Sequence, residues 1–226
     1  MIALRRMLFV LAAFAAVAFA STPARADTVV YTSRAQFTAA VPGLTTIDFE
    51  GIAPDNSVAN FATPLTIQGV TFSGSPTGMV SVVDDGFFSP LFQFNSGAVL
   101  SGFSYVEVTL PAGVTAIGVD LMSTNPDGRP FEVLLANGET FVVNTPLRPE
   151  RGFFGITTDV AIASIRFTTI PSQTQPGGIP LLDNFSFGQA QPGAVPEPAT
   201  IVLLGTGLAG VATRARRRRK AEKPGE

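Results

Sequence analysis

The chain of 226 residues contains no cysteine, no histidine and no tryptophan. Without cysteine it has no disulfide, no thiolate metal site and no thiol nucleophile. Without histidine it lacks the imidazole base of Ser-His-Asp and Cys-His catalysis, and it cannot form a histidine-ligated zinc site. These absences exclude the commonest hydrolytic mechanisms and metal centres before any motif is considered.

Positive charge is scarce in the middle of the chain. Between Asp27 and Pro192 there are five arginines and no lysine, against fourteen acidic residues. Nucleic-acid binding depends on lysine and arginine that neutralise phosphates, so we expect no nucleic-acid partner. An excess of carboxylates instead suits divalent cations.

The N-terminus has the parts of a secretory signal. Arg5 and Arg6 precede an apolar stretch over residues 7–20, and Ala24 and Ala26 are small residues at the positions that a signal peptidase inspects. We predict a signal peptide over residues 1–26, removed by signal peptidase; a cut after Ala20 is the alternative. An uncleaved anchor is disfavoured because the apolar stretch is short for a membrane span.

The C-terminus combines three unlike features. Pro196-Glu197-Pro198 is followed by an apolar run over residues 199–213 and then by a basic block. The basic block consists of Arg214, Arg216, Arg217, Arg218, Arg219 and Lys220. As a helix the run is about 22 Å long, against roughly 30 Å for the hydrocarbon core of a membrane. We predict one short transmembrane helix, with the basic block as a stop-transfer signal on the cytoplasmic side.

The basic residues lie outside both apolar segments, so the positive-inside rule predicts that everything between them is translocated. The order of the C-terminal features resembles the PEP-CTERM sorting signal of bacterial surface proteins, over residues 196–220. The resemblance implies processing by exosortase, a membrane protease. The protein would be anchored in the inner membrane before processing and would then reach the cell surface or extracellular matrix. Residues 189–195 are interpreted as a linker and 221–226 as the tail end.

Residues 27–188 are predicted to form one all-β domain. Short runs rich in Phe, Val, Ile and Thr are separated by Gly, Pro, Asn and Asp, which is typical of strands joined by turns. The predicted strands cover residues 28–31, 45–50, 66–73, 80–83, 103–110, 116–122, 131–135, 140–143, 153–157, 164–169 and 182–187. Because no helical crossovers separate them, we expect an antiparallel, jelly-roll-like β-sandwich.

Local motifs add detail to this fold. Asn137-Gly138 predicts a type I′ hairpin, and turns at residues 111–113 and 126–128 predict a meander from 103 to 143. Ser33 and Gln36 form a capping box for one short N-terminal helix that ends near Ala40. Phe37 is expected to pack this helix onto the sandwich.

The strands at residues 46–50, 67–72 and 182–187 resemble those of jelly-roll, lectin-like domains found upstream of PEP-CTERM tails. In sugar-binding modules of this kind, a structural calcium ion often joins the first long strand to the last. The resemblance therefore implies calcium ligands at Glu50 and Asp183, with Asp48 and Asn184 as alternates.

Polysaccharide binding needs an aromatic platform. Phe87 and Phe88 begin an apolar loop that is either a binding patch or a plug over the end of the sandwich. We predict a non-enzymatic surface or extracellular-matrix protein, and its sharper form is a module that binds exopolysaccharide. The alternative is a secreted polysaccharide hydrolase that uses carboxylates such as Asp48 and Glu50. We disfavour it because the chain has no recognisable catalytic signature.

Overall fold

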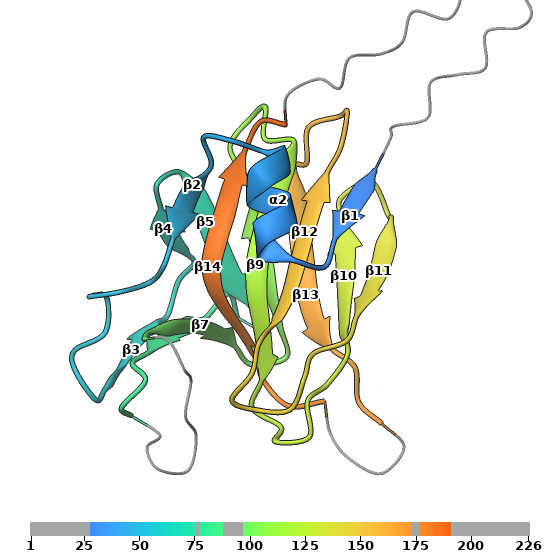
Figure 1. The fold of residues 1–226 in the computed structure, drawn as a ribbon. Coiled ribbons are helices and arrows are strands. Elements are labelled where there is room, and N and C mark those ends of the chain that lie inside the picture. The colour runs from blue at the N-terminus through green and yellow to red at the C-terminus, as the bar shows by residue number, and fades with distance from the viewer. Residues whose placement is uncertain (1–27, 76, 88–96, 173–176, 191–226) are drawn as a thin grey trace, which may run out of the picture. The chain divides into compact units, whose positions relative to one another are not determined.

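The computed structural model describes residues 28–75, 77–87, 97–172 and 177–190. They form two antiparallel sheets packed face to face, with one short helix on the outside (Figure 1). The predicted β-sandwich with one N-terminal helix is therefore confirmed. The predicted signal peptide and transmembrane segment lie outside the described residues. Within the described ranges, no helix combines the length and apolar character needed to cross a membrane.

The larger sheet has eight strands. In spatial order seven of them are β1 (Val29–Tyr31), β12 (Gly152–Thr157), β9 (Ala116–Ser123), β14 (Pro180–Gly188), β7 (Val99–Gly102), β6 (Val80–Val83) and β3 (Val58–Phe61). The eighth strand, β2 (Thr45–Ile47), pairs with the C-terminal half of β14, while β7 pairs with its N-terminal half.

The smaller sheet has six strands. Their spatial order is β11 (Thr140–Val143), β10 (Phe131–Leu135), β13 (Ser164–Thr169), β8 (Tyr105–Thr109), β5 (Val70–Gly74) and β4 (Leu65–Ile67). Every strand pair among the described residues is antiparallel in both sheets. β11 and β1 are edge strands, one in each sheet.

The core lies between the two sheets and follows the two-residue period of the strands. In β8, Val106 and Val108 are fully buried, whereas Tyr105, Glu107 and Thr109 lie on the outer face. Three phenylalanines interlock at the centre of this core. The ring of Phe72 meets those of Phe49 and Phe185 edge to face, with centroids 5.3 and 5.4 Å apart.

Strands β9 and β14 are buried on both faces. Helix α2 (Arg34–Ala40) covers part of the outer face of the larger sheet (Figure 1), and a separate apolar cluster around Leu181 covers another part. Phe37 of α2 is completely buried and sits over Gly118 of β9 and Gly155 of β12, where a Cβ would collide with the ring. The expected role of Phe37 is thus observed. The expected capping box is wrong, since the Ser33 side chain makes no capping hydrogen bond.

One turn prediction is wrong in type, and one predicted strand contains a turn. The loop at Asn137-Gly138 has three residues: Gly138 donates to Leu135 O (2.9 Å) and is left-handed (φ 88°), whereas Asn137 is not. This is a type I turn followed by a glycine bulge. The type I′ turn lies instead at Gln68 (φ 50°) and Gly69 (φ 82°), which divide the predicted strand 66–73 into β4 and β5.

The predicted meander is also wrong, because β8 and β9 lie in different sheets, as do β9 and β10. Turn residues mark where the chain reverses but not the sheet to which it returns. Strands β3 and β7 were not predicted. Both are four residues long and show no alternation of buried and exposed positions, so only their pairing with β6 reveals them.

Candidate functional site

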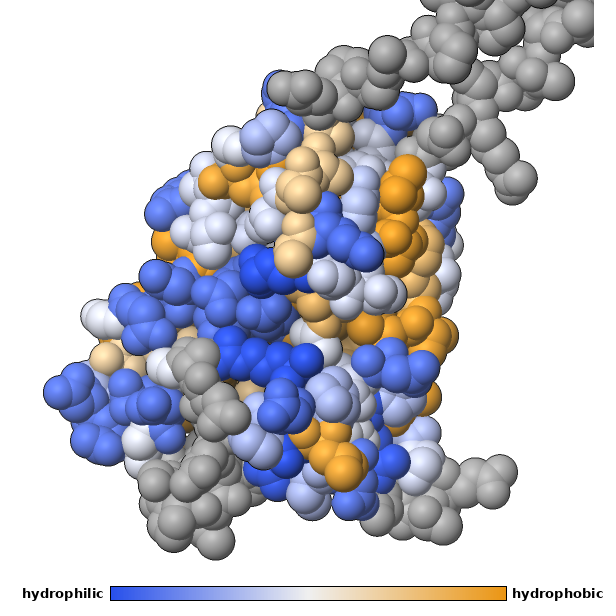
Figure 2. Space-filling model, in the orientation of Figure 1, coloured by the Kyte–Doolittle hydropathy of each residue, from blue (hydrophilic) through white to orange (hydrophobic). Residues whose placement is uncertain are grey.

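Four charged side chains meet on the outer face of the larger sheet, and we call them the Arg–Asp cluster: Arg34, Asp120, Arg151 and Asp183. Arg34 of α2 binds Asp120 of β9, with Nε and Nη2 at 3.1 and 3.0 Å from Oδ1. Arg151, just before β12, binds Asp183 of β14 at 2.7 Å and lies 3.7 Å from Asp120. Figure 2 shows hydrophilic side chains gathered below α2, over β14 and β9.

A β-bulge in β14 completes the cluster. The register with β9 shifts between Asp183 and Ser186, and Asn184 takes a left-handed conformation (φ 48°). The side-chain amide of Asn184 donates to Asp120 (3.0 Å) and to Asp183 (3.2 Å), and the backbone carbonyl of Asn184 accepts from Arg34 (2.9 Å). The bulge thus turns one residue into a link between both carboxylates and the helix.

The predicted calcium ligands have other partners in the structure. Asp183 is 3% exposed, and its carboxylate accepts from Arg151 and Asn184. Glu50 accepts from the backbone amide of Ala98 at 2.9 Å. Within the described ranges, no three acidic side chains gather as a candidate metal site. Calcium ligation by Glu50 and Asp183 stays a prediction.

The carboxylates considered for hydrolysis do not lie on a strand face. β2 ends at Ile47, and Phe49 is left-handed (φ 62°), so Asp48 and Glu50 belong to a turn. Within this turn, the Glu50 amide donates to the Asp48 carboxylate at 3.3 Å. The strand predicted over residues 45–50 is therefore too long by three residues.

Of the predicted aromatic pair, Phe87 is described and is 45% exposed. It closes a turn by donating its amide to Asp84 O at 3.1 Å. Phe88 lies outside the described residues. The same holds for the sorting motif Pro196-Glu197-Pro198 and for the basic block.

A hollow that was not predicted surrounds Phe103, between β7 and β8. We call it the Phe103 hollow. It has a volume of about 370 Å³, and Phe103 is 71% exposed. Its lining residues are Ser75, Thr77, Met79, Ser81, Ser101, Gly102, Phe103 and Ile179. The sequence held one signal: if Val106 and Val108 face the core, strand alternation directs position 103 outward.

A larger groove of about 790 Å³ runs between α2 and the edge strand β11. Arg34, Arg151 and Phe153 line it, and the Arg34 guanidinium lies 4.8 Å from the centroid of the Phe153 ring. Figure 2 shows apolar surface over β1 and the neighbouring edge, where Val30 is 42% and Val142 63% exposed. Both arginines already bind aspartates of the Arg–Asp cluster.

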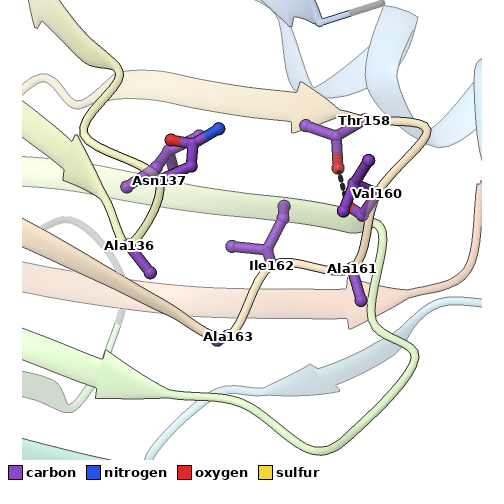
Figure 3. Close-up of a pocket in the computed structure, with 8 residues that line it drawn as sticks. Ala136, Asn137, Thr158, Val160, Ala161, Ile162 and Ala163 are labelled. Carbon is purple, nitrogen blue, oxygen red and sulfur yellow. Dashed lines mark hydrogen bonds between the residues drawn. The ribbon is translucent and has the colours of Figure 1, made fainter. Parts of the chain in front are cut away.

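A third hollow, of about 220 Å³, lies between the β10–β11 turn and the β12–β13 loop. Figure 3 shows Ala136 and Asn137 on one side and the segment from Thr158 to Ala163 on the other. Thr158 Oγ1 donates to the Val160 carbonyl at 2.6 Å, which stabilises the loop. The lining of this third hollow is mostly aliphatic, and it offers few groups that could orient a polar ligand.

Among solved structures, the chain is similar to several modules, all at low identity. One is the K2 cleaved adhesin domain of Lys-gingipain (12% identity, 65% of this chain and 98% of that one, TM-score 0.39). Another is a single-residue mutant of the family 29 carbohydrate-binding module CBM29-2 (15% identity, 65% of this chain and 92% of that one, TM-score 0.30). A third is TmCBM61 in complex with β-1,4-galactotriose (16% identity, 54% of this chain and 89% of that one, TM-score 0.28). These likenesses are too distant to assign a ligand.

No curated protein matches the chain. Residues 194–219, in contrast, match the PEP-CTERM protein-sorting motif. This segment contains Pro196-Glu197-Pro198, the apolar run and the basic block as far as Arg219. The predicted sorting signal is thereby confirmed. The chain carries a PEP-CTERM sorting motif, which indicates export and sorting to the cell surface through exosortase.

Proposed function

We propose that this protein is a non-enzymatic component of the cell surface or extracellular matrix, and that its β-sandwich binds exopolysaccharide. The observation that carries the proposal is the sorting motif at residues 194–219, directly after the sandwich, whose described residues end at Ala190. The sandwich is therefore the part that sorting delivers. Before processing, the apolar run holds the exported protein at the inner membrane.

The charged groups of the sandwich support binding over catalysis. Asp120, Asp183 and Glu107 each form an ion pair with an arginine, so these carboxylates are engaged in structural contacts. Glycoside hydrolysis needs two carboxyl groups that flank the scissile bond. Binding needs only a hollow with an apolar surface and a few polar groups, and the Phe103 hollow supplies both.

Sorting is tested by the fate of the tail. The full-length chain and Glu197→Ala are produced in cells with and without exosortase, and the mass and location of each product are measured. Wild type should lose its tail only when exosortase is present, and Glu197→Ala should retain it. Glu222→Ala, outside the matched residues, is the control and should be processed normally. Equal processing of all three proteins would contradict recognition of the motif.

Binding is tested with exopolysaccharide purified from the producing cells. Co-sedimentation measures retention, and an assay for reducing ends measures turnover. Retention without new reducing ends supports the proposal. Release of reducing ends favours the hydrolase alternative, and the absence of retention contradicts polysaccharide binding.

A further inference from the structure

We propose that the Phe103 hollow is the sugar-binding site of this protein and that its ligand is an uncharged polysaccharide. This inference rests on the proposed function and adds the site and the chemical class of the ligand. The volume of about 370 Å³ lies near the lower end of the range of ligand pockets, roughly 300–1,000 Å³. That size suits a short stretch of a glycan chain.

The turn that carries the aromatic ring is anchored in the core. Leu100 and Val106 on either side are fully buried, so both ends of the turn are fixed in the core. At Gly102 an added Cβ would collide with the Tyr105 carbonyl, so the chain turns tightly just before Phe103. Phe103 is 71% exposed on this short turn, so a ligand that covers the ring orders one side chain and no long loop.

An exposed phenylalanine is costly in water unless something covers it, and a sugar ring can do so. A pyranose has an apolar face of C–H groups, which can lie against the flat face of an aromatic ring. Met79, 46% exposed in the same hollow, enlarges this apolar surface with a flexible side chain that adapts to the shape of a ligand.

Residues with hydroxyl groups also line the hollow. Ser81 of β6 and Ser101 of β7 are directly paired across the two strands, so their side chains lie side by side on the outer face of the sheet. Ser81 donates to Asn60 at 2.6 Å, which leaves its oxygen free to accept. Ser101 donates to the Ser81 carbonyl at 3.4 Å, a long contact that a ligand hydroxyl could replace. Ser75 and Thr77 add two further hydroxyls.

Charge selects the class of ligand. None of the eight lining residues is charged, and the segment from Asp27 to Pro192 carries fourteen acidic residues against five arginines. An acidic polysaccharide would meet a net negative body and no cation in the hollow. The groove beside α2 does contain arginines, but these already bind Asp120 and Asp183. A neutral glycan matches the hydroxyls and the ring without an electrostatic penalty.

The test compares variants of the full-length chain. Affinity electrophoresis measures binding to the producer's exopolysaccharide, to dextran, mannan and galactan as neutral probes, and to polygalacturonate as an acidic probe. Phe103→Ala should weaken binding to neutral polysaccharide by about tenfold or more, as truncation of an aromatic anchor does at other interfaces. Phe103→Tyr keeps the ring and should bind like wild type. Ser101→Ala should weaken binding by a smaller factor.

Phe87→Ala tests the other phenylalanine that is exposed in the described ranges, which the sequence predicted for a binding patch. Leu147→Ala is the control, because Leu147 is also a large exposed apolar residue and lines none of the three hollows described above. Both variants should bind like wild type. Unchanged binding of Phe103→Ala, or loss only in Phe87→Ala, would overturn the assignment of the site while leaving polysaccharide binding intact. Binding to polygalacturonate alone would overturn the neutral class. If wild type bound none of these polysaccharides, the proposed function itself would fail.

Discussion

Arg34, the first residue of helix α2, donates from Nε to the Asp120 carboxylate on strand β9, 86 residues further along the chain, at a distance of 3.1 Å. This ion pair ties the N-terminal segment to the centre of the larger sheet. Asp120 also accepts from Asn184, so three parts of the chain that are distant in sequence share one carboxylate.

We therefore expect Asp120→Asn to be strongly destabilising. It removes the negative charge between Arg34 and Arg151, and breaking a largely buried pair in this way costs about 3 kcal/mol. Arg34→Met keeps the apolar stem and should cost about 1–2 kcal/mol. Urea unfolding of each variant measures the change in free energy of unfolding.

The control for this prediction is Arg166→Met on the outer face of the smaller sheet. Arg166 binds Glu107 at 2.6 Å, but both side chains are about one-third exposed. Solvent screens such a pair, so its loss should cost less than about 1 kcal/mol. A cost for Arg166→Met equal to that of Asp120→Asn would show that burial does not set the strength of these pairs.

The packing of helix α2 on the larger sheet can be tested at Gly118. In Gly118→Ala the new Cβ would overlap the Phe37 ring, 2.7 Å from its Cδ1, so the helix must shift. Overpacking of this kind costs about 1–3 kcal/mol. Phe37→Leu in the same background should recover part of this loss, which chemical denaturation of the four proteins measures as a coupling energy. Strictly additive effects would mean that the ring does not rest on Gly118.

The hairpin between β4 and β5 should respond to turn chemistry. Gly69→Ala places a side chain at φ 82° and should lower the free energy of unfolding by about 1 kcal/mol. Gln68→Asn supplies the residue preferred at the first position of a type I′ turn and should raise it by about 0.5 kcal/mol. Asn137→Gly is the contrast, since position 137 is not left-handed and a glycine there should give no gain. Thermal unfolding distinguishes these outcomes.

The calcium prediction has a direct test. If Glu50 and Asp183 hold an ion, then EDTA should lower the melting temperature of the full-length protein, and excess calcium should restore it. Asp183→Asn should abolish this response, whereas Asp127→Asn, at a turn remote in sequence, should retain it. A melting temperature that does not change when EDTA is added would contradict the prediction of a bound calcium ion.

Much of the fold follows from local pattern. The alternation of Val106 and Val108 with Glu107 and Thr109 is visible in the sequence and reappears as the two faces of β8. The short β3 and β7 carry no such pattern, because their positions are set by pairing with β6. Turn type at Asn137 was missed because a three-residue loop and a two-residue loop use the same Asn-Gly pair.

The candidate site was less predictable than the fold. Asp183 was singled out for calcium, but the sequence does not reveal that Arg151 reaches it, since 32 residues separate the two. The sequence predicts Phe103 as the first residue of a strand and, by alternation with Val106, directs its side chain outward. The tight turn at Gly102, where an added Cβ would collide with the Tyr105 carbonyl, is not visible in the sequence.

The linear chain alone determined the sorting motif, because a protease and a membrane read charge and apolar length along a segment without reference to any fold. It also determined the all-β character, because the period of the side chains is a local property. Only the tertiary structure decided which acids meet which arginines and which phenylalanine stays in water. Those outcomes depend on strands brought together from distant parts of the chain, where one bulge or one glycine changes which groups meet.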